Sequence, residues 1–216
     1  MQTVFITGST GYIGTRLIKA LQQQGNCHIK ALVRKGSENK LPAGCEIIFG
    51  NALDATSYQN AIAPASIFVH LIGVAHPSPS KKEQFKNIDL VSIQQAVKAA
   101  AGAGIQQFVY LSVAIHPTKI MKDFQQVRAQ GEALLLQQHF ISTFIRPWYV
   151  LGPGHWWPLL LKPVYFILKL FPSTRTGANN LETVTIAQMV RALVDAINTQ
   201  PIKNTIVDVQ MMRRLQ

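Results

Sequence analysis

The chain has 216 residues, of which 48% are hydrophobic and only 14% charged, a composition that excludes a disordered protein and suffices for one domain with a sizeable core. The formal net charge of +11 favours an anionic partner, but no long basic run or basic–aromatic pattern indicates nucleic acid. The first residues do not form a signal peptide, and Cys27 and Cys45 lack metal-ligand spacing. We therefore expect a cytoplasmic protein without a bound metal.

Short apolar runs rich in β-branched residues alternate with longer segments in which apolar residues recur at helical spacing. The predicted strands span residues 3–7, 28–33, 46–49, 67–72, 107–112, 143–146 and 205–209, and the predicted helices span 13–24, 83–101, 120–139 and 186–198. Thr185 and Gln188 form a predicted capping box before the last helix, and residues 74–85, which carry Pro and Ser, predict a loop.

Several of these strands are apolar throughout, which is typical of parallel strands with helices on both faces. No linker divides the chain. We predict an α/β fold in which residues 1–216 form a single Rossmann-like domain, with a doubly wound parallel sheet and helices on both faces.

Three glycines stand between the first predicted strand and the first predicted helix, in the order Gly8-x-x-Gly11-x-x-Gly14. Gly8 permits a tight turn, Gly11 lets the backbone approach a pyrophosphate, and Gly14 lets the helix pack closely on the sheet. The amino terminus of the helix then directs its N–H groups at the phosphates. This context of strand, turn and helix predicts a dinucleotide site.

The segment "ITGSTGYIG" resembles the extended and atypical members of the short-chain dehydrogenase/reductase superfamily. The resemblance continues through "ALVRK", "GNALD", "FVHLIG", "NIDLVSIQQAVKAAAGAGIQQFVYLS" and "FIRPWYVLGPG", and it is strongest to the NmrA-like, epimerase-like and complex I accessory-subunit-like members. It implies cofactor contacts from Gly8, Thr10, Gly11, Tyr12, Ile13, Gly14, Arg34, Asn51, Ala52, Leu71, Ile72, Gly73, Arg128 and Pro147.

The residue twenty positions after Gly14 is Arg34, followed by Lys35, where an enzyme that uses NAD places an acidic residue for the ribose 2′-hydroxyl. An arginine here can bind a 2′-phosphate through charge-assisted hydrogen bonds. We therefore favour NADP(H), and NAD(H) stays open because a basic turn can simply be solvated. His70, within the fourth strand, is expected to be a packed residue.

The superfamily's reductases use a Ser or Thr together with a Tyr-x-x-x-Lys pair. In "DFQQVRAQGEALL", aligned on Glu132, the tyrosine position holds Phe124 and the lysine position holds Arg128. The resemblance places Ser112 near the cofactor and the usual Ser/Thr position on Ala114. Phe has no hydroxyl for general acid–base chemistry, and Arg titrates too high to exchange protons.

Two functional hypotheses follow. One is a catalytically silent cofactor-binding protein, and the other is an NADPH-dependent oxidoreductase or epimerase-like enzyme with a non-standard acid. Candidates for that acid are Tyr149, His116 and His76, whereas Tyr110 lies within a strand and is expected in the core.

Residues 152–177 interrupt the alternation of strands and helices, and residues 156–172 are dense in large apolar side chains. Lys162, Lys169 and three prolines make this stretch a poor membrane span. It is predicted either to cover a pocket for an apolar small molecule or to contact a protein partner or a membrane surface.

Overall fold

The computed structural model describes residues 2–118, 120–156, 159–160, 163, 171, 177 and 180–215. Its centre is a parallel sheet with strand order β3-β2-β1-β4-β5-β6-β9, made of β1 (Gln2–Thr7), β2 (Cys27–Val33), β3 (Glu46–Phe49), β4 (Ile67–His70), β5 (Gln107–Leu111), β6 (Ile141–Ile145) and β9 (Thr205–Val207). A second, two-stranded parallel sheet pairs β7 (Tyr149–Leu151) with β8 (Thr183–Thr185).

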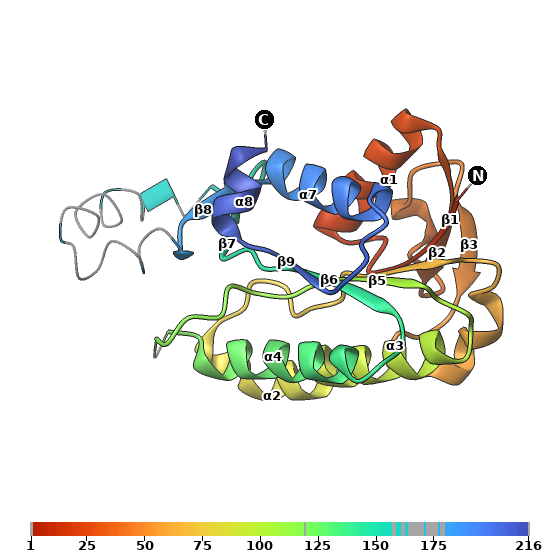
Figure 1. The fold of residues 1–216 in the computed structure, drawn as a ribbon, viewed down its shortest axis with the longest axis horizontal. Helices are drawn as coiled ribbons and strands as arrows, with labels where there is room; N and C mark the ends of the chain where they lie inside the picture. The colour runs from red at the N-terminus through yellow and green to blue at the C-terminus, as the bar shows by residue number, and fades with distance from the viewer. Residues whose placement is uncertain are drawn as a thin grey trace.

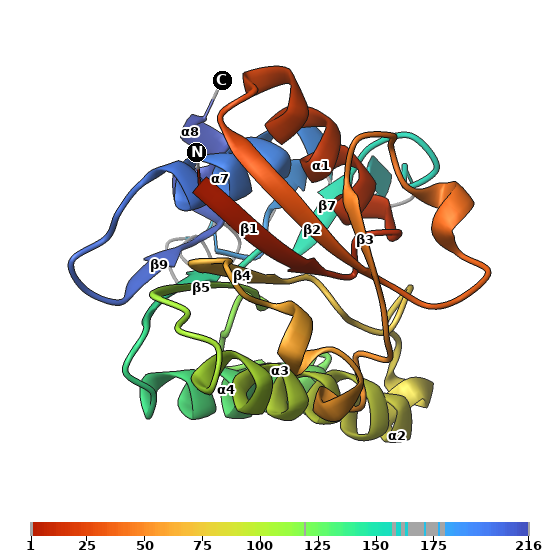
Figure 2. The same cartoon turned by 90° about the vertical axis from the view of Figure 1, so that its right-hand side faces the viewer.

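Helices cover both faces of the central sheet (Figures 1 and 2). One face carries α1 (Tyr12–Gln24), α7 (Ile186–Asn198) and α8 (Val209–Arg214), and the other carries α2 (Lys82–Gln84), α3 (Val91–Ala101) and α4 (Lys122–Leu136). The prediction of a doubly wound parallel sheet is therefore confirmed.

The alternation of side chains along β1 explains the two layers. Val4 and Ile6 pack with α1 and α7, whereas Phe5, between them, packs with Phe68 and Phe108 above α3 and α4. All five side chains are fully buried. Burial on both sides of each strand accounts for the continuous apolar runs in the sequence.

The predicted bounds need correction in several places; for example, the strand predicted over 67–72 ends at His70, and the helix predicted over 120–139 spans Lys122–Leu136. Residues 83–101 are helical, but a π-helical turn, Phe85–Leu90, separates α2 from α3. The predicted loop 74–85 already contains the 3₁₀ turn Pro79–Lys81 and α2. The last strand ends at Val207, because the Asp208 carboxylate accepts a hydrogen bond from the Met211 N–H and starts α8.

Two further predictions concern the capping box of α7 and the apolar residues 156–172. The capping box is confirmed, since the Thr185 hydroxyl accepts from the Gln188 N–H at 3.2 Å and the Gln188 side chain accepts from the Thr185 N–H at 3.0 Å. Most of 156–172, including Lys162 and Lys169, lies outside the described residues. Within the part of the chain that is described, no helix is long and apolar enough to cross a membrane.

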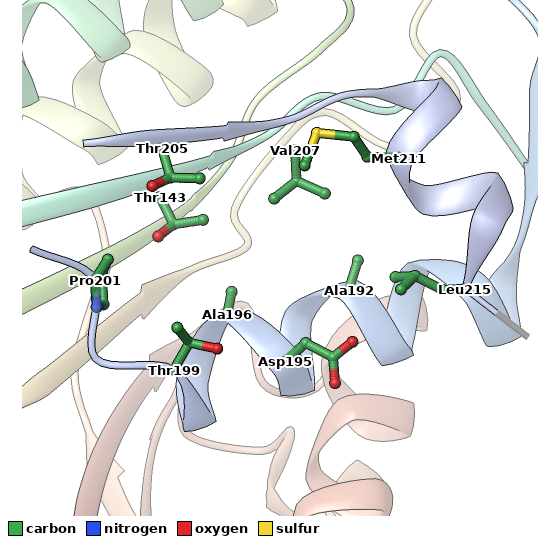
Figure 3. A pocket seen from close by; sticks show the side chains of 10 residues that line it. All are labelled: Thr143, Ala192, Asp195, Ala196, Thr199, Pro201, Thr205, Val207, Met211 and Leu215. Carbon is green, nitrogen blue, oxygen red and sulfur yellow. The ribbon is translucent and has the colours of Figure 1, made fainter. Parts of the chain in front are cut away.

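A cavity of about 230 Å³ lies between α7, α8 and β9 (Figure 3). Its lining is mostly apolar, and Asp195 is the charged residue in it. The cavity lies at the β9 edge of the sheet, four strands from β1 in the strand order. It is therefore separate from the glycine turn that follows β1.

Candidate cofactor site

The glycine turn lies where the strand order reverses, because β1 pairs with β2 on one side and with β4 on the other. Ligands of open α/β sheets bind outside the carboxyl ends of the strands at such a point. The Ser9 hydroxyl donates to the Leu32 carbonyl at 2.7 Å and ties the turn to β2. The predicted cofactor residues of the turn therefore lie beside the carboxyl ends of β2 and β4, and we call this edge of the sheet the crevice.

Each glycine of the motif has a different steric role. Gly8 has a φ of +75°, and a Cβ on it would lie 2.9 Å from the carbonyl carbon of Leu71. A Cβ on Gly14 would lie 2.2 Å from the Gly8 oxygen, so α1 packs against the turn only without a side chain there. At Gly11 the nearest contact, 3.1 Å to the Gly8 oxygen, is milder, so this position has room on the crevice side.

The amino terminus of α1 has the features of an anion site. Its N-cap is Gly11, which has no side chain to occupy the first turn, and that turn holds no acidic residue. The partial positive charge of a helix amino terminus favours a phosphate at this position. Thr10, Tyr12 and Ile13 lie in or beside this turn, as the resemblance implies.

The adenosine side of the crevice is basic and open. Arg34 and Lys35 directly follow β2 and are exposed, and Asn51 and Ala52 follow β3 on the neighbouring strand. The Asn51 Oδ1 accepts a hydrogen bond from the Leu53 N–H at 3.0 Å. This bond engages the amide oxygen, so the group with which Asn51 could donate to a ligand is its NH₂.

On the opposite side, the Arg128 guanidinium is buried and bound by the protein itself. One terminal nitrogen donates to the carbonyls of Ile72, at 3.2 Å, and Leu111, at 2.9 Å, and the other contacts the Asp89 carboxylate at 2.6 Å. The Asp89 side chain is fully buried and also accepts from the Val74 N–H at 3.0 Å. Arg128 therefore joins α4 to the carboxyl ends of β4 and β5.

Gly73 makes this arrangement possible. A Cβ at Gly73 would lie 2.2 Å from a terminal nitrogen of Arg128, so the predicted cofactor-lining glycine is also the space that admits the guanidinium. Burial raises the pKa of the Asp89 carboxyl, while the Arg128 charge and the Val74 N–H act in the opposite direction. The pair balances two charges that would be costly to bury singly.

Phe124 lies one helical turn before Arg128 on the same face of α4. The Arg128 guanidinium carbon is 5.2 Å from the centre of the Phe124 ring, and the Phe85 ring packs against the Phe124 ring at a centroid distance of 5.0 Å. The tyrosine position of the resemblance is thus filled by an apolar cluster. Glu132, which set the alignment, is buried and forms a two-bond pair with Arg146.

Ser112, directly after β5, is buried, and its hydroxyl has no hydrogen-bond partner in the described structure. Its N–H donates to the Ile145 carbonyl at 2.8 Å, and the Ala114 N–H donates to the Pro147 carbonyl at 2.8 Å. Ser112 and Pro147 therefore both lie at the carboxyl ends of β5 and β6, the side of the sheet that the cofactor would occupy.

A neutral polar network lies beneath the crevice. The Thr7 hydroxyl is 2.9 Å from Nδ1 of His70, whose Nε2 is 3.2 Å from the Ser92 hydroxyl, and that hydroxyl donates to the Asp89 carbonyl at 3.0 Å. Because Ser92 donates its proton to that carbonyl, it accepts from His70, which fixes the Nε2-protonated tautomer. Burial lowers the pKa of His70 to about 3. The expectation that His70 is a packed residue is confirmed.

The alternative acids lie around the rim. The His116 N–H donates to the Gln125 side chain at 2.8 Å, which places this loop beside the first turns of α4. Tyr149 begins β7 and is half-buried, and burial raises its pKa. Tyr110 is buried within β5, as expected, with its hydroxyl 3.5 Å from Arg128.

Two residues of the site lay outside the sequence-based predictions. Asp89 could have been noticed as a lone acidic residue within the apolar pattern of a predicted helix, "NIDLVSI". His155 could not, because its place beside Tyr12, at a ring-centroid distance of 4.4 Å, depends on the turn after β7.

These features fit a dinucleotide. Cβ atoms on Gly8 or Gly14 would clash with neighbouring backbone, and no side chain caps the first turn of α1. At the strand ends, the buried Ser112 hydroxyl and the Arg128 Nε have no hydrogen-bond partner among the described residues. Residues 8–148 match a family model described as NAD(P)H-binding. The chain therefore belongs to this NAD(P)H-binding family, and its cofactor class is a nicotinamide dinucleotide.

Its relatives confirm the resemblance to the short-chain dehydrogenase/reductase superfamily. The chain is 24% identical over 115 residues to the UDP-glucose 4-epimerase of Vibrio cholerae, covering 51% of this chain and 34% of that protein. It is 26% identical over 151 residues to the uncharacterized sugar epimerase YhfK of Bacillus subtilis, covering 67% and 70%. The matched region thus spans only about a third of the first relative.

A solved structure agrees with the fold. The chain superposes with a TM-score of 0.70 and 15% identity on a short-chain dehydrogenase/reductase superfamily protein of Agrobacterium tumefaciens with bound NAD, covering 99% of this chain and 81% of that one. At this identity the likeness concerns the fold.

Proposed function

We propose that the chain binds NADP(H) and lacks the tyrosine-dependent proton transfer of the superfamily. The observation that carries this proposal is the pairing of Phe124 with a buried Arg128 on one face of α4. A bound nicotinamide supplies or accepts a hydride, but Phe124 has no proton to give. Arg128 is held by Asp89 and two backbone carbonyls and stays protonated. A role as a redox sensor or an assembly subunit is compatible with this chemistry.

The preference for NADP(H) rests on the residues after β2. Arg34 and Lys35 are exposed at the end of the strand next to the glycine turn, where a 2′-phosphate would lie. Nothing acidic precedes them on β2, whose sequence is CHIKALV. A guanidinium here forms charge-assisted hydrogen bonds with a phosphate that a 2′-hydroxyl does not match.

A second candidate function is an active reductase or epimerase-like enzyme with another acid. It is supported by the Ser112 hydroxyl, which lies buried at the strand ends and has no hydrogen-bond partner among the described residues. It is supported also by the epimerases among the relatives. His116 and Tyr149 are its candidate acids, because both lie on the rim of the crevice.

The two functions are separated by presenting aldehydes, ketones and quinones to the NADPH-loaded protein and following oxidation of the cofactor. The first predicts binding with little or no turnover, and the second predicts turnover that His116→Gln or Tyr149→Phe reduces. The double variant Phe124→Tyr, Arg128→Lys restores the superfamily pair and is expected to raise turnover if a carbonyl reaches the nicotinamide. Phe49→Tyr, which adds a hydroxyl on exposed β3, is the matched control.

A further inference from the structure

A cluster of basic and aromatic side chains, which includes the candidate acid His76, lies beside the glycine turn. The imidazoles of His76 and His155 stack with centroids 5.0 Å apart and an interplanar angle of 17°. His155 in turn lies 4.4 Å from the ring of Tyr12, the first residue of α1, and the Arg16 guanidinium is 3.9 Å above the same ring. We call His76 and His155 the histidine pair.

The histidine pair joins the two walls of the crevice. His76 belongs to the loop after β4, and Gly8 packs against the start of that loop at Leu71. His155 comes from the opposite side, after β7, and contacts the helix that the glycine turn begins. The pair therefore lies next to the backbone that would receive a diphosphate.

Both histidines are held in place by local structure. The His155 N–H donates to the Gly152 carbonyl at 2.8 Å across a tight turn in which Gly154 has a φ of +81°. His76 itself has a φ of +49°, a conformation that is unfavourable for a residue with a side chain. The Lys81 ammonium donates to the carbonyls of Ala75 and His76, at 2.6 and 3.0 Å, and fixes this loop. Backbone strain of this kind is concentrated at functional sites.

The electrostatic surroundings of the pair are basic. Burial lowers the pKa of His155, and the charges that lower it further belong to His76 and Arg16. Lys81 adds an ammonium to the His76 loop, and Glu182, before β8, pairs with Arg213. Among the residues that the structure describes, none is a hydrogen-bond partner of the buried Tyr12 hydroxyl. The Arg16 guanidinium and the Lys81 ammonium are both cationic, and cationic groups gathered at one place attract an anion.

We propose that His76, His155 and Arg16 form an anion-binding subsite that grips a phosphoryl group from the side opposite the glycine turn. This inference rests on the proposed function, because the crevice it closes is the one that would hold the cofactor. The phosphoryl group has two possible sources, the cofactor's own diphosphate and a nucleotide-linked substrate. In both cases the imidazoles donate hydrogen bonds to phosphate oxygens, and binding takes up protons.

The test compares His76→Gln and His155→Gln with His139→Gln, an exposed histidine after α4, as the matched control. Calorimetry measures binding of NADPH, of ADP-ribose, and of UDP-glucose to the NADPH-saturated protein. Wild type is expected to bind the gripped ligand more tightly as the pH falls from about 8 to about 6, because binding favours the protonated imidazoles. Each variant is expected to lose about tenfold in affinity and most of that pH dependence.

The ligands distinguish the sources. Weaker binding of NADPH and ADP-ribose alike assigns the subsite to the cofactor's diphosphate, and weaker binding of UDP-glucose alone assigns it to a substrate. The inference is overturned if, for each of the three ligands, both variants bind with the same affinity as wild type. If wild type binds no NADPH, the proposed function fails independently of the subsite.

A second measurement does not depend on variants. Proton NMR follows the histidine titrations of wild type with and without inorganic pyrophosphate. The inference predicts that pyrophosphate moves the imidazole resonances of His76 and His155 and leaves those of His139 in place. No change in any histidine overturns the inference.

Discussion

The glycine turn after β1 and the helix α4 face the same crevice with different chemistry. In the turn, the backbone of Gly8 packs against that of Leu71 and the backbone of Gly14 against that of Gly8, so neither glycine has room for a side chain. On α4, the residues that face the strand ends are Phe124 and a guanidinium already bound to Asp89. One side of the crevice is shaped to receive a ligand, and the other is filled by the protein's own contacts. The proposal that this chain binds its cofactor without tyrosine-dependent proton transfer rests on this difference.

The largest effect is expected from a substitution in the glycine turn. Gly11→Val is expected to abolish measurable NADPH binding, because a β-branched side chain would occupy the space where the backbone meets the pyrophosphate. The protein should remain folded, since a Cβ at Gly11 meets only the Gly8 oxygen at 3.1 Å. Calorimetry and thermal melting measure the two properties. Gly102→Val is the control, because a Cβ there meets nothing within 4 Å. Normal binding by Gly11→Val would make the turn purely structural.

On the α4 side, a substitution is expected to lower the stability of the fold. Asp89→Ala leaves the buried Arg128 charge without its partner, and we expect a loss of about 3–5 kcal/mol in the free energy of unfolding. Urea denaturation of the cofactor-free protein measures it. Asp123→Ala is the control, because Asp123 lies on α4 with Arg128 but its ion pair with Lys82 of α2 is exposed and should contribute about 0–1 kcal/mol. Similar losses in the two variants would show that the buried pair is not a special anchor.

A smaller effect, on the choice between NADPH and NADH, is expected at Arg34 and Lys35. Wild type is expected to bind NADPH more tightly than NADH, and Arg34→Ala should lose about 1.5–3 kcal/mol of NADPH binding with little change for NADH. Calorimetry with both cofactors measures this difference. Lys40→Ala, a second exposed basic residue beyond β2, controls for overall charge. If wild type binds both cofactors equally, Arg34 does not read the 2′-phosphate.

A further effect, which builds up gradually with pH, concerns the network beneath the crevice. Because the folded-state pKa of His70 is depressed to about 3, the unfolded chain binds a proton that the folded chain rejects. Stability should therefore fall as the pH drops below about 6.5, by up to about 1.4 kcal/mol per pH unit from this group. Chemical denaturation at several pH values measures the slope. His70→Asn should flatten it relative to His139→Asn, and equal slopes would show that His70 becomes protonated in the folded protein.

The sequence was sufficient for the parts of the molecule that depend on local patterns. The continuous apolar runs of the strands, the capping box at Thr185 and the glycine spacing each follow from a rule that acts over a few residues. Arg128 and Gly73 were both singled out as cofactor residues, but their mutual contact was not foreseen. That contact requires α4 to pack across the end of β4, 55 positions away in the sequence.

The same limit applies to β7 and β8, which form a sheet of three-residue strands that no periodicity could reveal. It applies also to the stack of His76 on His155, which joins two loops that are distant in sequence. Short elements and contacts between loops depend on tertiary packing, which overrides local preference.

The separation of binding from proton transfer is tested most directly by following the near-ultraviolet absorbance of NADPH bound to the wild-type protein while carbonyl compounds are added. The fluorescence of the bound nicotinamide shows in the same cuvette that the site is filled. We predict that the absorbance stays constant, because Phe124 supplies no proton and Arg128 releases none. Rapid loss of absorbance with any carbonyl compound would contradict this, and the acid would then have to be found among His116, Tyr149 and the histidine pair.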